Sequence, residues 1–504
     1  MAENRYKDVD GIRHGMVFFH RESGCGDQQR IVWIKLLYEE MRMKKAKQKT
    51  RNIDLLNGPI FTSLTGLAVP IMATALVQMA YNLTDMAWIG LVGSGAVASV
   101  GTAGMYTWLS QGVVMLARMG GQVKVAHSLG EGRQDEAARY AAGAIQLGIF
   151  LAVCYSLITV SLARTLIGFF GLTSPQIIED AVQYMRITCG CIIFMYMNVI
   201  LTGILTATGD SRTSFLANVV GLIANIILDP LMIFGIGPFP EMGVKGAAVA
   251  TVTAQFIVTL VFILAVRRDK VIFDKIRLLS VTPIRYFKSM ARIGLPSAIQ
   301  ELIYCLISMS MTRLVAGWGD AGVAVQRVGS QIESISWMTA EGFGAAVNSF
   351  IGQNYGARRY SRVRQGYLTA VKTMIVWGLF CSGLLIAIPG SIFGLFIHEP
   401  EIIPMGIDYL KILGYSQMFM CIEITTVGAF SGLGKTLPSS ILSIIFTSAR
   451  LPVAAALSAT PLGIDGIWWA FTVTSIAKGL IFFTGYMMTL KKMEGNYGKG
   501  LEFH

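Results

Sequence analysis

The chain carries little charge. Of its 504 residues, only 14% are Asp, Glu, Lys or Arg, whereas 53% are hydrophobic. Soluble domains carry about 25% charged residues. Apolar runs of about 20 residues, each long enough to span a bilayer as a helix, recur along most of the chain after residue 60. The alternating segments of about 10 residues that are typical of a membrane β-barrel are absent. The composition therefore predicts an all-α polytopic membrane protein.

The chain also lacks the usual marks of a metal or redox centre. Its seven cysteines show no spacing typical of a metal cage or a disulfide framework. All five histidines lie outside the apolar runs, which argues against haem or a metal centre within the membrane. A membrane-embedded enzyme needs a metal or a nucleophile and base at one depth, and the runs offer no histidine for this. We therefore expect neither an enzyme nor a cofactor.

The net charge of +12 could suggest a nucleic-acid partner, but its distribution points to a membrane surface instead. Basic residues collect beside the apolar runs, in "MRMKKAKQKTRN" before the first run and again in residues 267–292. Such clusters mark cytoplasmic segments. The polar start has no cleavage site after an apolar core, so we do not interpret it as a signal peptide. We expect a plasma (inner) membrane protein with both termini in the cytoplasm and no nucleic-acid partner.

Twelve spans are predicted along the chain. They divide it into a basic tail (1–54), a first lobe (55–267), a basic linker (268–292), a second lobe (293–490) and a short cytoplasmic tail (491–504). The spans are 60–89, 96–118, 140–163, 183–207, 214–236, 244–266, 293–316, 322–350, 367–388, 405–431, 437–458 and 464–489.

The two predicted lobes repeat each other. "LAVPIMATAL" pairs with "IGLPSAIQEL", which aligns Pro70 with Pro296, and three further motif pairs follow in the same order at offsets of 220 to 226 residues. Six spans in each lobe give both lobes the same membrane orientation. The sequence thus predicts a pseudo-twofold axis along the membrane normal, an arrangement typical of secondary transporters.

One apolar run contains an aspartate. Asp85 lies in "YNLTDMAWIG", and Gln78, Tyr81 and Asn82 precede it on roughly the same helix face. A charge at the bilayer centre costs roughly 2.5–3.5 kcal/mol on insertion scales, so an intramembrane acid is a functional candidate by default.

A second acid lies at a similar predicted depth. Asp229 follows Asn225 by four residues in the fifth span, and Asn198 lies in the fourth span. Two carboxylates with amide neighbours predict a site for H⁺ or Na⁺, and the sequence does not separate the two ions. The alternative is structural, since Pro230 follows Asp229 and either acid could cap a kinked helix or pair with a base. The repeat aligns Asp85 with Met311 and Asp229 with Leu451, so the fold itself does not require the acids.

The second lobe carries acids of its own. Glu301 and Glu341 could line a cytoplasmic vestibule, and Glu423 could pair with Arg450 or contact a substrate. Methionines and aromatic rings add flexible and cation-binding surface. The predicted substrate cleft comprises Gln78, Tyr81, Asn82, Met86, Tyr196, Met311, Glu301, Glu341 and Glu423.

Several motifs resemble the multidrug and toxic compound extrusion (MATE) family. They are "NLTDMAWIG", "GILTATGDSRTSFLANVVGLIANIILDPL" and "GVKGAAVAT" in the first lobe, and "GLPSAIQE", "IGQNYGA" and "GLGKTLPS" in the second. The resemblance covers roughly residues 55–490 and implies two six-helix lobes around a central cleft. It also implies cation-coupled efflux of organic cations by rocking between outward- and inward-open forms.

The resemblance assigns coupling roles residue by residue, to Asp85, Asn198, Asn225 and Asp229. Some family members also use acids on helices 7 and 10, where Glu301 and Glu423 lie here, but the local motifs differ. We therefore expect a monomeric antiporter that exports amphipathic, cationic small molecules across the lipid bilayer in exchange for H⁺ or Na⁺. The alternative is a flippase for lipid-linked oligosaccharides, which would favour a wider and more basic cleft.

Overall fold

A computed structural model describes residues 53–170, 174–267, 273–276, 280, 282–395 and 402–498, and within these ranges the secondary structure is helical. The first half contains α3 (Ile60–Val92), α4 (Ser94–Gly130), α5 (Gln134–Ser161), α6 (Ala163–Gly168), α7 (Pro175–Gly190), α8 (Ile193–Thr208), α9 (Ser211–Ile233) and α10 (Val244–Val266). After the 3₁₀ turn η1 (Phe273–Lys275) come α11 (Ile284–Ala316), α12 (Asp320–Gly356), α13 (Tyr360–Ala387), α14 (Pro389–Phe393), α15 (Ile403–Gly414), α16 (Gln417–Gly432), α17 (Thr436–Ser458) and α18 (Ile464–Gly498). Most of the predicted basic tail lies outside the described residues.

The helices follow the predicted spans, although several extend beyond the predicted ends and the spans 183–207 and 405–431 are each split into two helices. Among the described residues, eight single helices are long and apolar enough to cross a membrane, and α7 with α8 makes a ninth candidate that bends by 45°. The fourth predicted span is therefore a broken pair that begins earlier, at Pro175. Helix α11 begins at Ile284, so residues 284–292 of the predicted linker are helical. The remaining three predicted spans correspond to α4, α12 and the pair α15–α16, which carry more polar residues and glycines.

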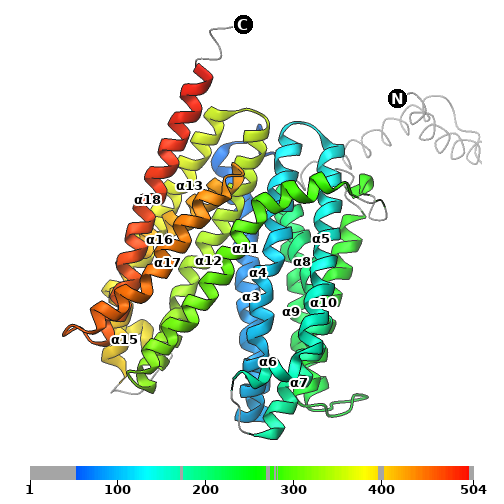
Figure 1. Cartoon of the computed structure of the whole chain (residues 1–504), viewed down its shortest axis with the longest axis vertical. Helices are drawn as coiled ribbons and strands as arrows, with labels where there is room; N and C mark the ends of the chain where they lie inside the picture. Colours follow the sequence, from blue (N-terminus) through cyan, green and yellow to red (C-terminus); the bar gives the residue numbers. More distant parts are fainter. Residues whose placement is uncertain are drawn as a thin grey trace, which may run out of the picture. The chain divides into compact units, whose positions relative to one another are not determined.

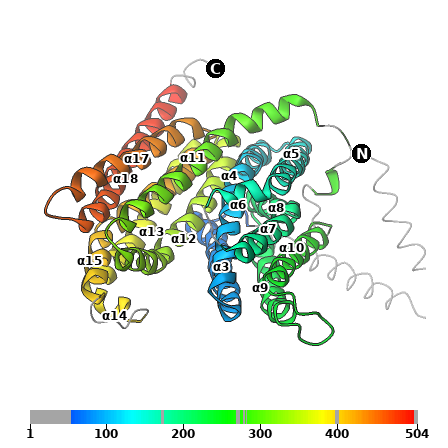
Figure 2. The ribbon, with the colours of Figure 1, turned by 60° about the horizontal axis from the view of Figure 1, so that its bottom comes forward.

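The helices gather in two groups. Figures 1 and 2 show α5 and α7–α10 together on one side and α13–α18 on the other, with α3, α4, α11 and α12 between them. We refer to α3–α10 as the first lobe and to α11–α18 as the second lobe.

The first helix of each lobe crosses from one hydrophobic core to another. Leu64 and Leu67, near the start of α3, are buried in a cluster otherwise formed mainly by second-lobe helices, whereas Ile89 near its end is buried in the first lobe. The start of α11 mirrors this, because Met290 is buried in the first-lobe core and Met311 in the second lobe. Each lobe therefore completes part of the other's core.

The two lobes approach closely at the end of the bundle that holds Gly130 and Gly356, which we call the closed end. A Cβ atom built on Gly130 would lie 2.0 Å from the Gln353 carbonyl oxygen, and one on Gly356 would lie 2.3 Å from that of His127. His127 Nε2 lies 2.7 Å from the Gly432 carbonyl oxygen, and Gln353 Nε2 donates to the Ala207 carbonyl at 2.7 Å. Backbone contact and hydrogen bonds thus join the lobes at this end.

A short segment before α3 reinforces the closed end. The Ile53 amide donates to the Gly209 carbonyl of the first lobe at 3.2 Å. From the second lobe, Asn354 Nδ2 donates to the Leu55 carbonyl at 3.0 Å and Arg359 donates to the Leu56 carbonyl at 2.7 Å. The segment therefore contacts both lobes at once.

Candidate functional site

The Asn225–Asp229 pair lies on one face of α9, as its spacing predicts. Both residues are fully buried, and Asn225 Nδ2 donates to Asp229 Oδ1 at 2.9 Å. Helix α9 continues through Pro230 to Ile233, so Asp229 lies within the helix. Asp229 therefore does not lie at the end of a helix. Because proline has no N–H, Pro230 also leaves the carbonyl of Ile226 without its usual helical donor.

Asp85 faces this pair from α3, which packs along α9. Asp85 and Asp229 lie within electrostatic reach of each other, and Tyr81 lies within reach of both. Within the described part of the chain, neither acid forms an ion pair with a basic side chain. The structure thus brings together the two acids that the sequence predicts at one depth, and no described base compensates their charge.

Several oxygen atoms in this cluster are buried and have no hydrogen-bond partner among the described residues. They are Asp85 Oδ1, Asp229 Oδ2, Asn225 Oδ1, the Tyr81 hydroxyl and the Thr251 hydroxyl. A buried unsatisfied polar group costs about 1–3 kcal/mol, and more when it is charged. Convergent oxygen atoms in need of a partner fit a proton or a hard cation, which would satisfy them.

Helix α10 closes the other side of the cluster, and sequence reasoning missed its contribution. Thr251, Gln255 and Thr259 recur at four-residue spacing on one face of α10 within "ATVTAQFIVT". This polar stripe on an apolar helix is the signal that could have identified them. Gln255 and Thr251 both lie beside Tyr81.

Asn198 occupies a supporting position next to this stripe. Its Nδ2 donates to Gln255 Oε1 at 2.8 Å, and the Thr259 hydroxyl donates to Asn198 Oδ1 at 2.8 Å. Since both ends of its amide are hydrogen-bonded, Asn198 orients Gln255 rather than presenting free atoms to an ion. A cavity of about 10 Å³ adjoins the cluster and is lined in part by Gln78, Tyr81 and Gln255, which is about the room that one water requires.

The predicted cleft residues divide into two groups. Gln78, Asn82 and Glu341 are exposed, and Tyr81, Met86 and Glu301 are half-buried. By contrast, Tyr196 and Met311 are fully buried. The Tyr196 hydroxyl donates to the Ser110 carbonyl at 3.1 Å, and Met311 belongs to an apolar cluster of the second lobe. The structure therefore places these two side chains in hydrophobic cores, where they cannot line a cleft.

Glu423 has a partner other than the predicted one. Its Oε1 lies 2.6 Å from Lys478 Nζ of α18, and both side chains are buried. Arg450 instead donates to the hydroxyls of Thr474 and Ser475, each at 3.2 Å. The predicted Glu423–Arg450 pair is therefore wrong, because α18 places a lysine closer to the acid than α17 places its arginine. The single lysine inside the predicted span 464–489 was the available signal.

A further group of charged side chains, Arg118, Glu301 and Glu341, lies between the two lobes. Arg118 of α4 lies within electrostatic reach of Glu301 on α11 and Glu341 on α12. The two acids that the sequence assigns to a vestibule thus share one base from the opposite lobe.

No group of three or more His, Cys, Asp or Glu side chains that could hold a metal ion occurs in the described ranges. The oxygen cluster around Asp85 and Asp229 has only two carboxylates, which suits a monovalent ion better than a tightly held divalent metal.

Comparison with known proteins gives a consistent family. The MatE family model matches residues 70–231 and 296–456, one match in each half of the chain. A probable multidrug resistance protein NorM from Thermotoga maritima is 29% identical over 432 residues, which cover 83% of this chain and 91% of the relative. An FAD transporter from Shewanella oneidensis is 24% identical over 84% of this chain and 94% of its own length.

Solved structures agree with the fold. A structure described as the outward-facing conformation of a multidrug resistance MATE family transporter of the MOP superfamily matches with a TM-score of 0.81 and 25% identity. The match covers 88% of this chain and 98% of that one. The two-lobe helical architecture is therefore shared with a known transporter.

Proposed function

Because the chain belongs to the MATE family of multidrug efflux transporters, we propose that it is an antiporter that exports amphipathic, cationic small molecules in exchange for H⁺ or Na⁺. The observation that carries the proposal is the pair of the fully buried Asp229 and the half-buried Asp85, which has several buried, unsatisfied oxygens around it and no described basic partner. Such a pair is stable only when an ion neutralises it, and this requirement makes it a natural ion-exchange site.

We propose different roles for the residues of the cluster. Asp85 is the main coupling carboxylate, since its helix α3 contacts both lobes and can transmit a change at the acid to either one. Asp229, oriented by Asn225, shares the proton or ion with Asp85. Asn198 acts indirectly by holding Gln255 beside Tyr81. One elementary charge that crosses a potential of 100 mV supplies about 2.3 kcal/mol to drive the export.

Alternating access follows from the arrangement of the lobes. Described basic residues that follow Gly356, namely Arg358, Arg359 and Arg362, support a cytoplasmic location for the closed end, and hence for both termini. Glycine contacts and hydrogen bonds hold this end together. We therefore propose that the exposed Glu341 and half-buried Glu301 are reached from the opposite side in this state, and from the cytoplasmic vestibule expected from the sequence only after the lobes rearrange. Release of the ion at Asp85 would then accompany separation of the closed end. We further propose that one chain in the inner membrane suffices as the transport unit.

Replacing Asp85 by Asn tests the coupling role. Asp85→Asn keeps the size of the side chain but cannot exchange a proton or carry a charge. We expect gradient-driven ethidium efflux to fall to background in proteoliposomes while the purified variant keeps its melting temperature. Efflux by the parent protein is also measured with a pH gradient alone and with a Na⁺ gradient alone, and the gradient that drives efflux identifies the coupling ion.

Glu241→Gln, in the loop between α9 and α10, is the matched control and should transport at the parent rate. If Asp85→Asn transports as fast as the parent, Asp85 is not the coupling residue. Efflux that persists after an ionophore collapses the gradients would argue against antiport altogether.

A further inference from the structure

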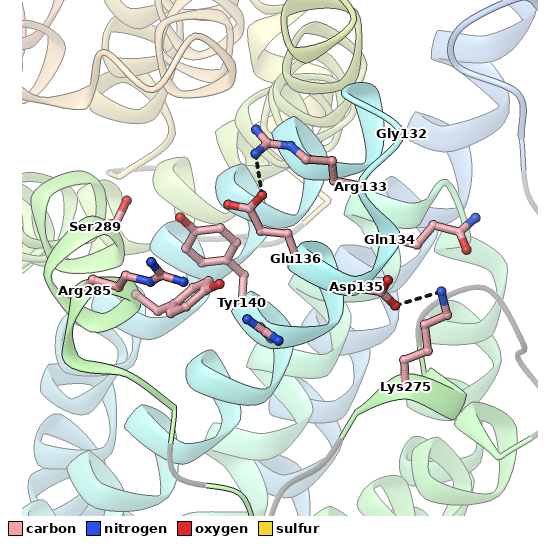
Figure 3. Close-up of a pocket in the computed structure, with 11 residues that line it drawn as sticks. Gly132, Arg133, Gln134, Asp135, Glu136, Tyr140, Lys275, Arg285 and Ser289 are labelled. Atoms are coloured by element: carbon pink, nitrogen blue, oxygen red, sulfur yellow. Dashed lines mark ion pairs between the residues drawn. The ribbon is translucent and has the colours of Figure 1, made fainter.

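A pocket of about 910 Å³ lies at the closed end, away from the Asp85–Asp229 cluster. It is formed by the turn and first residues of α5 together with η1 and the first residues of α11 (Figure 3). Four basic and two acidic side chains line it, which leaves a net charge of +2. The basic ones are Arg133, Arg139, Lys275 and Arg285, and the acidic ones are Asp135 and Glu136.

Two of the four basic groups are already neutralised. Arg133 pairs with Glu136 at 2.8 Å and also with Glu131, and Lys275 Nζ lies 2.9 Å from Asp135 Oδ1. The acids of the pocket are thus both engaged. Figure 3 marks the Arg133–Glu136 and Lys275–Asp135 pairs with dashed lines.

The other two basic groups, Arg139 and Arg285, form no ion pair with any described residue. Arg139 lies beside the Tyr286 hydroxyl and interacts electrostatically, at longer range, with Asp135 and Glu136. The Arg285 guanidinium lies 5.1 Å from the centre of the Tyr286 ring. Tyr286 therefore holds one guanidinium at its hydroxyl and one at its ring.

The aromatic floor of the pocket is buried and closely packed. Tyr140 and Tyr286 are both buried, and their rings meet edge to face with centroids 4.8 Å apart. Tyr140 also lies beside Ser289 and under Lys124, whose Nζ is 5.8 Å from the ring centre. A closely packed floor reduces the ordering that the arginines need before they can bind a ligand.

We propose that this pocket binds a phosphate group, with Arg139 and Arg285 as its ligands and Ser289 as an additional hydroxyl donor. Guanidinium groups bind phosphate oxygens in a bidentate manner, and the pocket offers two of them without competing carboxylates in contact. The phosphate could belong to an anionic lipid headgroup of the adjacent leaflet or to a free cytosolic phosphate compound. The pocket joins the first lobe to the start of α11, so a bound phosphate would stabilise the junction between the lobes.

The test uses the full-length protein with two probes. The first probe is inorganic phosphate, titrated against the protein in phosphatidylcholine nanodiscs and followed by the melting temperature, with chloride at equal ionic strength as reference. The second probe is phosphatidylglycerol in mixed vesicles with phosphatidylcholine, and the lipid retained by the protein is counted by native mass spectrometry.

We expect Arg139→Gln/Arg285→Gln to weaken binding of at least one probe about tenfold or more, since it removes two charge-assisted contacts. Lys288→Gln is the surface control, because it removes one positive charge from an exposed position of α11 that does not line the pocket. It should change binding less than about twofold, in keeping with a weak surface charge. Arg139→Lys/Arg285→Lys keeps the positive charges but removes the paired N–H donors of the guanidinium groups, so it should give an intermediate loss of binding. This variant keeps the test valid even if the glutamine variant folds poorly.

Loss of phosphatidylglycerol alone identifies a lipid headgroup as the ligand, and loss of phosphate alone identifies a soluble compound. Parent-like binding of both probes by the glutamine variant overturns the proposal, as does an equal loss in Lys288→Gln. The result is independent of the transport proposal, because neither arginine contacts the Asp85–Asp229 cluster.

Discussion

Met311 and Leu451 lie together in an apolar cluster of the second lobe. The internal repeat aligns these two residues with Asp85 and Asp229. The same place in the two lobes therefore holds an apolar contact in one and an acid pair in the other. The fold accommodates either arrangement, so packing alone does not explain the acids of the first lobe.

This comparison predicts that Asp85→Met leaves the protein as stable as the parent, or more so, while efflux is lost. The substitution copies the second lobe and removes a carboxylate whose Oδ1 is buried and unsatisfied. Asp229→Leu should differ, because it also deprives Asn225 of its acceptor at a cost of about 1–3 kcal/mol. Thermal unfolding of both variants in the same detergent checks the order, and a larger loss for Asp85→Met would contradict it.

At the residue scale, the sequence was enough to propose the Asp85–Asp229 pair, since depth along two helices of the same direction can be read from span boundaries. It was not enough to place Tyr196 and Met311, because the direction of a side chain around a helix depends on packing against other helices. Tyr and Met occur both in clefts and in cores, so residue type carries little information on which of the two these side chains face.

At the scale of elements, the buried ion pair between Glu423 and Lys478 links α16 to α18. Removing one partner of a buried pair leaves an uncompensated charge, whereas replacing both is often neutral. We therefore expect the loss of one partner to destabilise the protein more than the loss of both.

We predict that Lys478→Met destabilises the protein by about 3–5 kcal/mol and that the double variant Glu423→Gln/Lys478→Met recovers most of this loss. Chemical unfolding of the parent, both single variants and the double variant completes the cycle. Additive losses in the double variant would show that the two side chains do not interact.

Helix ends and breaks were less predictable than helix existence. The break between α7 and α8 falls at Cys191 and Ile192, without a proline or a polar cluster to signal it. Helix α11 extends back to Ile284 because its first residues pack into the first lobe, and this contact is invisible in local sequence. Tertiary contacts of this kind decide where an amphipathic segment next to a membrane becomes helical.

At the scale of the whole molecule, the closed end depends on glycine. Gly130 and Gly356 occupy equivalent places in the repeat, and each faces a backbone carbonyl of the opposite lobe. A side chain at either position must push the lobes apart. The internal repeat predicted two equivalent lobes, but the sequence did not indicate that these paired glycines form the contact between them.

We predict that Gly130→Ala and Gly356→Ala each destabilise the protein by about 1–3 kcal/mol, the usual cost of overpacking. Gly104→Ala is the matched control on α4, because a Cβ there meets nothing within 4 Å. Melting temperatures of the three variants provide the measurement. Because alanine is the better helix former, Gly104→Ala should be as stable as the parent or slightly more stable. A loss in this control as large as in the other two variants would contradict lobe contact as the cause.

The crossing of α3 and α11 between cores has a consequence for biosynthesis. The ribosome completes the first six spans before α12 and α13 exist, so Leu64 and Leu67 have no core to enter at that stage. The first lobe likewise waits for the start of α11, which supplies Met290 to its core. Neither half of the chain can finish folding alone, and a nascent chain stopped after the sixth span would remain incomplete in the membrane. Assembly of this transporter is therefore a late event that requires both halves to be present.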